Sequence, residues 1–168
     1  MLENKNNIIF DTMWLIRLIS KSLLEKIVEK SNIFITPAIK AELDEKQRKI
    51  IDQMIIEGKI IKLELFDKSF QDRIAKLYKK HKRYLYEAFI KKRYSQLSDL
   101  GEMEIIAFVL NQKTENTYLI FTFDKEARNI MKSYHKTKMS LVQLRSEEER
   151  EILGLTNEEI EKVYRGHD

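Results

Sequence analysis

Four acidic residues of this chain stand at positions suited to metal binding. Each lies where a predicted strand ends or a predicted helix begins: Asp11 in IIFDTMWLI, Glu42 in TPAIKAEL, Glu102 in SDLGEMEIIAF and Asp124 in LIFTFDKEAR. Carboxylates that converge in apolar surroundings repel one another and lose hydration, so a cluster of them is tolerated mainly when a divalent cation neutralises it. The pattern therefore predicts a site for Mg²⁺, of the kind that a metal-dependent nuclease uses.

Each of these acids, taken alone, has a simpler interpretation. Asp11 and Asp124 could be helix N-caps, and Glu42 could be an ordinary charge on an amphipathic helix. Glu102 is more informative, because the helix predicted around it is otherwise so apolar that a carboxylate there needs a reason. Glu104 lies two residues further on, roughly 200° around a helix, so the two glutamates cannot both point into one site. One of them is expected to be structural.

The neighbours of the four acids include an aspartate and two threonines. Asp99 lies one turn before Glu102 on the same helix face, and could be a fifth acid, a group that supports the ligands, or a favourable charge at a helix N-terminus, the last being favoured. Thr12 and Thr122 stand beside predicted ligands, where a hydroxyl could orient a carboxylate or a metal-bound water. Local backbone capping explains both threonines at least as well.

Strands and helices alternate along the chain. The apolar runs predict strands at 7–10, 33–35, 59–65, 118–123 and 139–144. Helical periodicity and capping signals predict helices at 12–30, 37–58 (as two), 67–96 (as one or two), 99–111 with Ser98 as its cap, 124–135, and two short ones after Ser146 and Thr156. This alternation predicts an α/β fold with a parallel sheet, in which ligands bind beyond the carboxyl ends of the strands.

Composition narrows the function further. The chain of 168 residues is 43% hydrophobic and has no internal linker, so we expect a single domain over 1–168. The absence of cysteine excludes disulfides, zinc–thiolate clusters, iron–sulfur centres and thiol nucleophiles. The four glycines form neither a phosphate-binding loop nor a dinucleotide fingerprint. The N-terminal segment resembles neither a signal peptide nor a membrane span, so we expect a cytoplasmic protein with no membrane partner.

Positive charge is concentrated in one segment. Ten Lys or Arg stand against two acids between 68 and 93, a net of +8 in a chain whose total is +4, which leaves −4 for the remainder. Such a segment is either a surface that meets a nucleic acid or a solvated helix face, and the sequence favours neither. The nucleic-acid-binding candidates are Lys79, Lys80, Lys82, Arg83, Lys91, Lys92 and Arg93.

The order of the motifs resembles that of the PIN-domain ribonucleases. A strand is followed by Asp-Thr, a helix with Glu follows Thr-Pro, Gly-Glu-x-Glu opens an apolar helix, and a strand ends in Thr-x-Asp-Lys. The similarity extends from Ile8 to about Leu144, and four short motifs in this order are more specific than any one of them. The Gly-Glu form looks like the branch of the family with GEAEAIAL-type helices.

This resemblance implies a fold, a site and a reaction. The fold would be a three-layer α/β/α PIN-like domain with a central parallel sheet of about five strands. In that family the acidic quartet coordinates one or two Mg²⁺ or Mn²⁺ ions and hydrolyses phosphodiester bonds in RNA. The resemblance carries over to Asp11, Glu42, Glu102 and Asp124 as this quartet, with Thr122 as a hydroxyl that lines the site. Homodimers are also common in the family.

Two segments depart from the compact family pattern, a long basic helical insertion at 67–96 and an acidic helical tail at 146–168. They leave the substrate and the partner open. The toxin of a toxin–antitoxin pair, which would bind an antitoxin protein, and an RNA-processing or defence nuclease are both compatible with the sequence. The alternative outside enzymes is a catalytically silent module that binds nucleic acid or protein with a PIN fold.

Other aspartate-based enzymes fit less well. The haloacid-dehalogenase pattern needs a second aspartate two residues after the first, and Met13 occupies that position after Asp11. A response-regulator receiver needs an acidic pair near its first strand, which this chain does not offer.

Overall fold

The core of the protein is a five-stranded sheet in which all the strands run parallel, in the order β3-β2-β1-β4-β5. The computed structural model describes residues 5–65, 67–90, 99–112, 116–134, 139–144 and 146–166. The strands are β1 (Asn6–Phe10), β2 (Ser31–Ile35), β3 (Ile60–Lys62), β4 (Tyr118–Phe121) and β5 (Met139–Leu141). The expected α/β class and parallel five-stranded sheet are confirmed.

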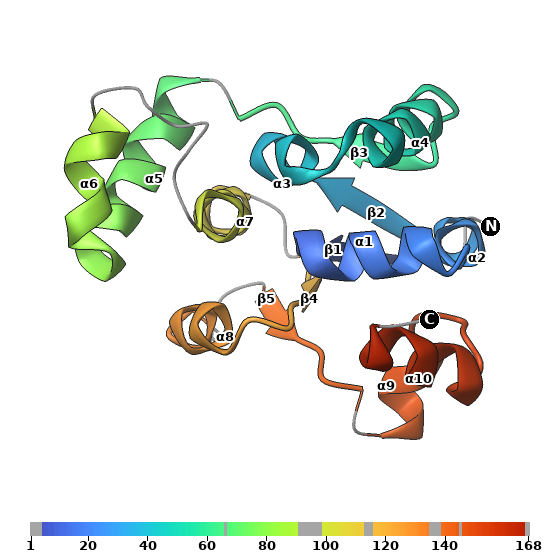
Figure 1. The fold of residues 1–168 in the computed structure, drawn as a ribbon. Helices are drawn as coiled ribbons and strands as arrows, with labels where there is room; N and C mark the ends of the chain where they lie inside the picture. The colour runs from blue at the N-terminus through green and yellow to red at the C-terminus, as the bar shows by residue number, and fades with distance from the viewer. Residues whose placement is uncertain are drawn as a thin grey trace.

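Helices cover both faces of this sheet. Figure 1 shows α1 and α2 on one face and α7 and α8 on the other, a three-layer α/β/α arrangement. The helices of the described ranges are α1 (Thr12–Ser20), α2 (Leu24–Lys30), α3 (Pro37–Glu42), α4 (Glu45–Ile56), α5 (Lys68–His81), α6 (Arg83–Ile90), α7 (Leu100–Leu110), α8 (Lys125–Lys132), α9 (Glu147–Glu151) and α10 (Asn157–Arg165). Among them, no helix is both long and apolar enough to cross a membrane.

The central strand positions the first acidic residue. Ile8, Ile9 and Phe10 are fully buried, because β1 lies between β2 and β4 and is covered by helices on both faces. The backbone N–H of Asp11 continues this pairing by donating to the carbonyl of Phe121, with 2.9 Å between N and O. Asp11 therefore lies at the carboxyl end of the strand in the middle of the sheet.

Several predicted boundaries are wrong. The helix expected over 12–30 is two helices, because the chain turns at Ser22, which has a φ of 57°. The N-cap of α7 is Asp99, whereas the predicted cap, Ser98, lies outside the described residues. The third and fifth strands end earlier than predicted, at Lys62 and Leu141.

The basic segment folds as two helices where the structure describes it. α5 ends at His81 and α6 begins at Arg83, and the backbone of Lys82 between them is not helical, with φ −138° and ψ 56°. Residues 91–96 of the predicted insertion lie outside the described ranges. The helix break matters for the site, because it determines where the Lys82 side chain points.

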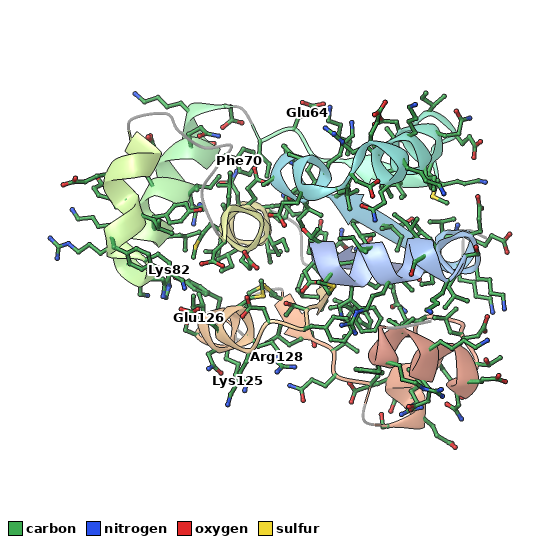
Figure 2. The ribbon with its side chains drawn as sticks, viewed as in Figure 1. Glu64, Phe70, Lys82, Lys125, Glu126 and Arg128 are labelled. Carbon is green, nitrogen blue, oxygen red and sulfur yellow. The ribbon has the colours of Figure 1, made fainter. Side chains whose placement is uncertain are left out.

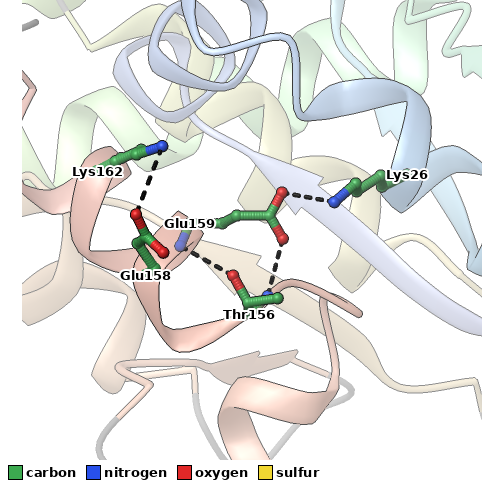
Figure 3. Close-up of polar contacts among 5 residues, drawn as sticks. All are labelled: Lys26, Thr156, Glu158, Glu159 and Lys162. Carbon is green, nitrogen blue, oxygen red and sulfur yellow. Dashed lines mark hydrogen bonds and ion pairs between the residues drawn. The ribbon is translucent and has the colours of Figure 1, made fainter.

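The acidic tail is docked on the domain. Both predicted caps are present, with Ser146 accepting from the N–H of Glu149, and Thr156 forming a capping box with Glu159. Glu159 also pairs with Lys26 of α2, with 2.6 Å between the carboxylate oxygen and Nζ (Figure 3). The same glutamate thus caps its own helix and ties it to the N-terminal half of the chain.

Candidate metal centre

A cavity of about 460 Å³ is lined by all four predicted acids. Asp11 follows β1, Glu42 ends α3, Glu102 lies in the first turn of α7, and Asp124 is the N-cap of α8. These elements are far apart in sequence. The parallel topology brings them together, because the ends of β1 and β4 and the start of α7 meet at one edge of the sheet.

Asp11 is held rigidly and is only 8% exposed. Its Oδ1 accepts from the N–H of Trp14 at 2.8 Å, so it caps α1, while Oδ2 accepts from the N–H of Phe123 at 3.0 Å. Burial raises the pKa of this carboxyl above its ordinary value, although hydrogen bonds, including one from the Thr122 hydroxyl, act in the opposite direction. The capping role and the position in the cavity are compatible, because a carboxylate has about four lone-pair sites and the three hydrogen bonds leave one free.

Asp124 and Thr122 are joined by a hydrogen bond at the end of β4, next to Asp11. Asp124 caps α8 by accepting from the N–H of Ala127 at 3.1 Å, and its own N–H donates to the hydroxyl oxygen of Thr122 at 3.1 Å. Thr122 is buried and hydrogen-bonded to both aspartates. It was expected to line the site, yet it is not among the residues around the cavity. Instead its hydroxyl connects Asp11 to the backbone of Asp124.

Glu42 and Glu102 differ in their environment. Glu42 is exposed, and its Oε2 accepts a hydrogen bond from the Thr12 hydroxyl at 2.7 Å. Glu102 is desolvated, and this burial, with repulsion from Asp99, Asp124 and Glu42, raises its pKa to about 7. A carboxyl that is desolvated next to other carboxylates favours either a proton or a cation at this point.

Asp99 belongs to this acidic group. Oxygens of Asp99, Glu102 and Asp124 lie within 4.8 Å of one another. Although Asp99 occupies the N-cap position of α7, its side chain makes no capping hydrogen bond and pairs with Lys82, with 3.2 Å between Oδ2 and Nζ. The interpretation favoured from the sequence was that Asp99 is a favourable charge at the N-terminus of this helix. The spacing of three residues between Asp99 and Glu102 was the signal that favoured the site.

Glu104 points away from this cavity. It is 6% exposed, and its Oε1 accepts from the N–H of Ala38 at 2.8 Å, while the Thr36 hydroxyl also donates to it. Burial raises its pKa to about 6. The contacts fix the start of α3, the helix that ends in Glu42. The two glutamates of the Gly-Glu-x-Glu motif therefore have separate surroundings, as the helix geometry requires.

Gly101 allows α7 to approach α3 closely. A Cβ at this position would lie 3.0 Å from Cγ1 of Ile39 and 3.9 Å from Oε1 of Glu42. A larger residue would therefore crowd the Ile39 side chain between the two helices that carry Glu102 and Glu42. The glycine of the motif thus has a packing reason next to the acidic residues.

The predicted nucleic-acid-binding residues divide into three groups. Lys79, Lys80 and Arg83 are exposed. Lys91, Lys92 and Arg93 lie outside the described residues. Lys82 is only 3% exposed, so its predicted role in a surface that binds nucleic acid, and the alternative of a solvated helix face, are both wrong for Lys82.

Lys82 joins the basic helices to the acidic centre. Its ammonium is ion-paired with Asp99 and with Glu126 of α8, which lies next to it in Figure 2. Burial lowers the pKa of this lysine, but the hydrogen bonds to the two acids outweigh that effect and raise it. Lys82 was expected at the surface because helical periodicity was applied to the whole segment. The helix break at Lys82 turns its side chain toward the two acids instead.

Arg17 is a cavity residue that sequence reasoning missed. It lies on α1, one turn after Met13, and both side chains line the cavity with the acids. The spacing of four residues was a weak signal, because it is common to every amphipathic helix.

A comparison with protein-family models finds none that matches the chain, and a comparison with curated proteins finds no match either. The resemblance to the PIN-domain ribonucleases therefore rests on the order of the motifs. Any assignment of function depends on the residues of the cavity.

Proposed function

We propose that this chain is a metal-dependent endoribonuclease with a PIN-like domain, which hydrolyses phosphodiester bonds in RNA. The observation that carries the proposal is the set of four carboxylates, from four separate elements, around one cavity at the carboxyl edge of a parallel sheet. A protein that needed these acids only as helix caps would not have to bring them together, since their mutual repulsion is unfavourable.

The donor set fits Mg²⁺ or Mn²⁺. Both ions prefer oxygen ligands, and Asp11, Glu42, Glu102 and Asp124 offer carboxylate oxygens, with Asp99 close to two of them. When bound, such an ion lowers the pKa of a water molecule and offsets charge on a phosphate. The protein then needs no nucleophile of its own, which suits a cavity whose described lining contains neither cysteine nor histidine.

The surrounding residues would orient the ligands. The N–H of Phe123 and the Thr122 hydroxyl hold Asp11, and the Thr12 hydroxyl holds one oxygen of Glu42. Hydrogen bonds of this kind fix the direction of the remaining lone pairs before a ligand arrives. Glu102 has to lose its proton near neutral pH to act as a ligand.

The substrate would approach over the basic helices. Lys79, Lys80 and Arg83 provide exposed positive charge on α5 and α6, suited to the phosphates of RNA. In this proposal the basic helical segment is an insertion into the PIN-like domain that binds RNA. A toxin with a cognate antitoxin, a processing enzyme and a defence nuclease are alternative roles of the same chemistry, and a homodimer and a cytoplasmic location stay predictions.

The decisive experiment is an RNA cleavage assay with Mg²⁺ or Mn²⁺, with and without EDTA. Wild-type protein should cleave single-stranded RNA only when the metal is present. A parallel calorimetric titration with Mn²⁺ separates two failures. Binding of the metal without cleavage would contradict the enzyme and support a silent binding module, and no binding at all would contradict the metal centre.

A further inference from the structure

Arg17 is the one cation among the described residues that line the acidic cavity. Its Nη1 donates to the carbonyls of Val163 and Tyr164, at 3.0 and 3.1 Å, and its Cζ lies 4.3 Å from the ring centroid of Phe123. These carbonyls are in the last turn of α10, where a positive charge is favourable. The C-terminal helix therefore holds the guanidinium in place at the cavity.

The Nε and Nη2 atoms of Arg17 form a second edge of the guanidinium, which does not contact these carbonyls. Within the described ranges no residue accepts a hydrogen bond from Nε or Nη2 of Arg17, and no buried side-chain nitrogen or oxygen lacks a partner, so both atoms reach solvent. A Cβ at position 166 would lie 2.7 Å from Cζ, 2.9 Å from Nη2 and 3.0 Å from Nε, so Gly166 packs against the guanidinium and a side chain at this position would collide with it. The Nε–Nη2 edge presents two parallel N–H groups, the geometry that binds two oxygens of one phosphate.

We propose that Arg17 binds a phosphate of the substrate RNA next to the phosphate at the acidic centre, an inference that rests on the proposed ribonuclease function. Asp11 and Arg17 are separated by six residues, about 9 Å of helix rise, and both line the same cavity, which suits a phosphate next to the one at the carboxylates. Four carboxylates repel a polyanion, and a fixed cation beside them offsets that repulsion. Because three contacts already order the side chain, little conformational entropy is lost on binding.

This inference gives the acidic tail a function. α10 supplies the two carbonyls that fix Arg17, and Glu159 and Lys26 tie the same helix to α2 (Figure 3). The tail is thereby a structural part of the substrate site, although none of its described residues lines the cavity.

The test measures binding of a fluorescein-labelled single-stranded RNA by anisotropy, with Ca²⁺ in place of Mg²⁺ and a gel to show that the RNA stays intact. Arg17→Gln should weaken binding at least about tenfold and lower the salt slope by roughly 0.7. Arg17→Lys should keep the slope but bind less tightly than wild type, since an ammonium cannot form the two parallel bonds. Lys46→Gln is the matched control, because it removes one exposed positive charge of α4, outside the cavity and away from the tail.

The outcomes separate this inference from the ribonuclease proposal. Wild-type affinity and slope in Arg17→Gln would overturn it, as would an equal loss in Lys46→Gln. If Arg17→Gln does not fold, Arg17→Lys decides, and wild-type affinity in that variant overturns the inference. Wild-type protein that neither binds nor cleaves RNA would overturn both, whereas cleavage with an unchanged KM in Arg17→Gln would overturn only the role of Arg17.

Discussion

The backbone N–H of Phe123 donates a hydrogen bond to Oδ2 of Asp11, with 3.0 Å between the two atoms, across 112 residues of sequence. It joins the ends of two neighbouring strands, β1 and β4, at the acidic cavity. The ring of Phe123 is stacked on Trp14, at 4.8 Å between centroids and 7° between planes. The direction of the Asp11 carboxylate is therefore set by the packed core and not by a mobile loop.

Asp11→Asn should abolish metal-dependent cleavage and keep the fold. The amide has nearly the same shape as the carboxylate and can still accept one of the two backbone hydrogen bonds, but it no longer carries the charge that attracts a cation. We expect less than about 1% of wild-type cleavage, a loss of at least ~2.7 kcal/mol in transition-state stabilisation. Cleavage rates and circular dichroism measure the two effects, and retained activity would contradict a role of Asp11 as a metal ligand.

Glu102→Gln and Glu104→Gln form a matched pair, with the same chemical change two residues apart. Glu102 lines the cavity, so its amide variant should lose activity. Glu104 contacts the start of α3 instead, and glutamine can still accept from the N–H of Ala38, so its variant should keep most of the turnover. A lower kcat for Glu104→Gln than for Glu102→Gln would show that Glu104, and not Glu102, acts in the reaction.

Truncation of Glu104 should have a different effect from its amide. Glu104→Ala leaves the buried N–H of Ala38 and the Thr36 hydroxyl without their acceptor, which costs about 1–3 kcal/mol in the free energy of unfolding. It should also loosen α3 and thereby Glu42, so that metal binding weakens. Urea denaturation of the two variants tests this, and equal stability of Glu104→Ala and wild type would show that the contact contributes little.

Local signals in the sequence were sufficient to predict the parallel sheet and the acidic residues that follow its strands. The buried run before Asp11 and the strand before Asp124 are continuous apolar stretches with an acid directly after them. The caps at Ser146 and Thr156 were also predicted correctly, because each depends on residues three positions apart. Patterns of this range reflect contacts within one element.

The contacts between elements could not be predicted in this way. The helix break at Ser22 occurs without glycine or proline nearby, so the local sequence does not predict it. Lys82 looked like one more exposed lysine until the helix break turned it towards Asp99 and Glu126. Arg17 was missed because its partners are carbonyls of the tail, and a carbonyl is present at every position of a chain.

The pH dependence of metal binding should follow Glu102. Its pKa in the folded protein is about 7, against an ordinary value of 4.5, so between these values the folded state holds a proton that the unfolded state has lost. Glu102 therefore contributes to the free energy of unfolding of the metal-free protein in full below pH 4.5, and this contribution is lost as the pH rises through 7. Mn²⁺ has to displace the same proton, so its affinity should rise about tenfold per pH unit below 7 and level off above it.

Calorimetric titrations at several pH values measure this dependence. Glu102→Gln provides the control, because an amide has no proton to lose and its residual Mn²⁺ affinity should vary much less between pH 6 and 7. A wild-type affinity that stays constant over this range would show that Glu102 is not coupled to the bound metal.

The exposed cations of the basic helices should contribute to RNA binding through their charge. Replacing Lys79, Lys80 and Arg83 together with glutamine removes three positive charges, and each phosphate contact contributes roughly 0.7 to the salt slope for a single strand. We expect weaker RNA binding and a slope smaller by about 2 if all three make contacts, with Mn²⁺ affinity unchanged. Lys82 is left intact, because its buried ion pairs would confound the result.

The matched control for this variant replaces three exposed cations of α4, Lys46, Arg48 and Lys49, with glutamine. It lowers the net charge of the protein by the same amount without touching α5 or α6. A smaller slope in the α5–α6 variant alone would show that these helices meet the RNA backbone. Equal slopes in both variants and wild type would identify the basic segment as a solvated helix face, and equal reductions would show that only the total charge matters.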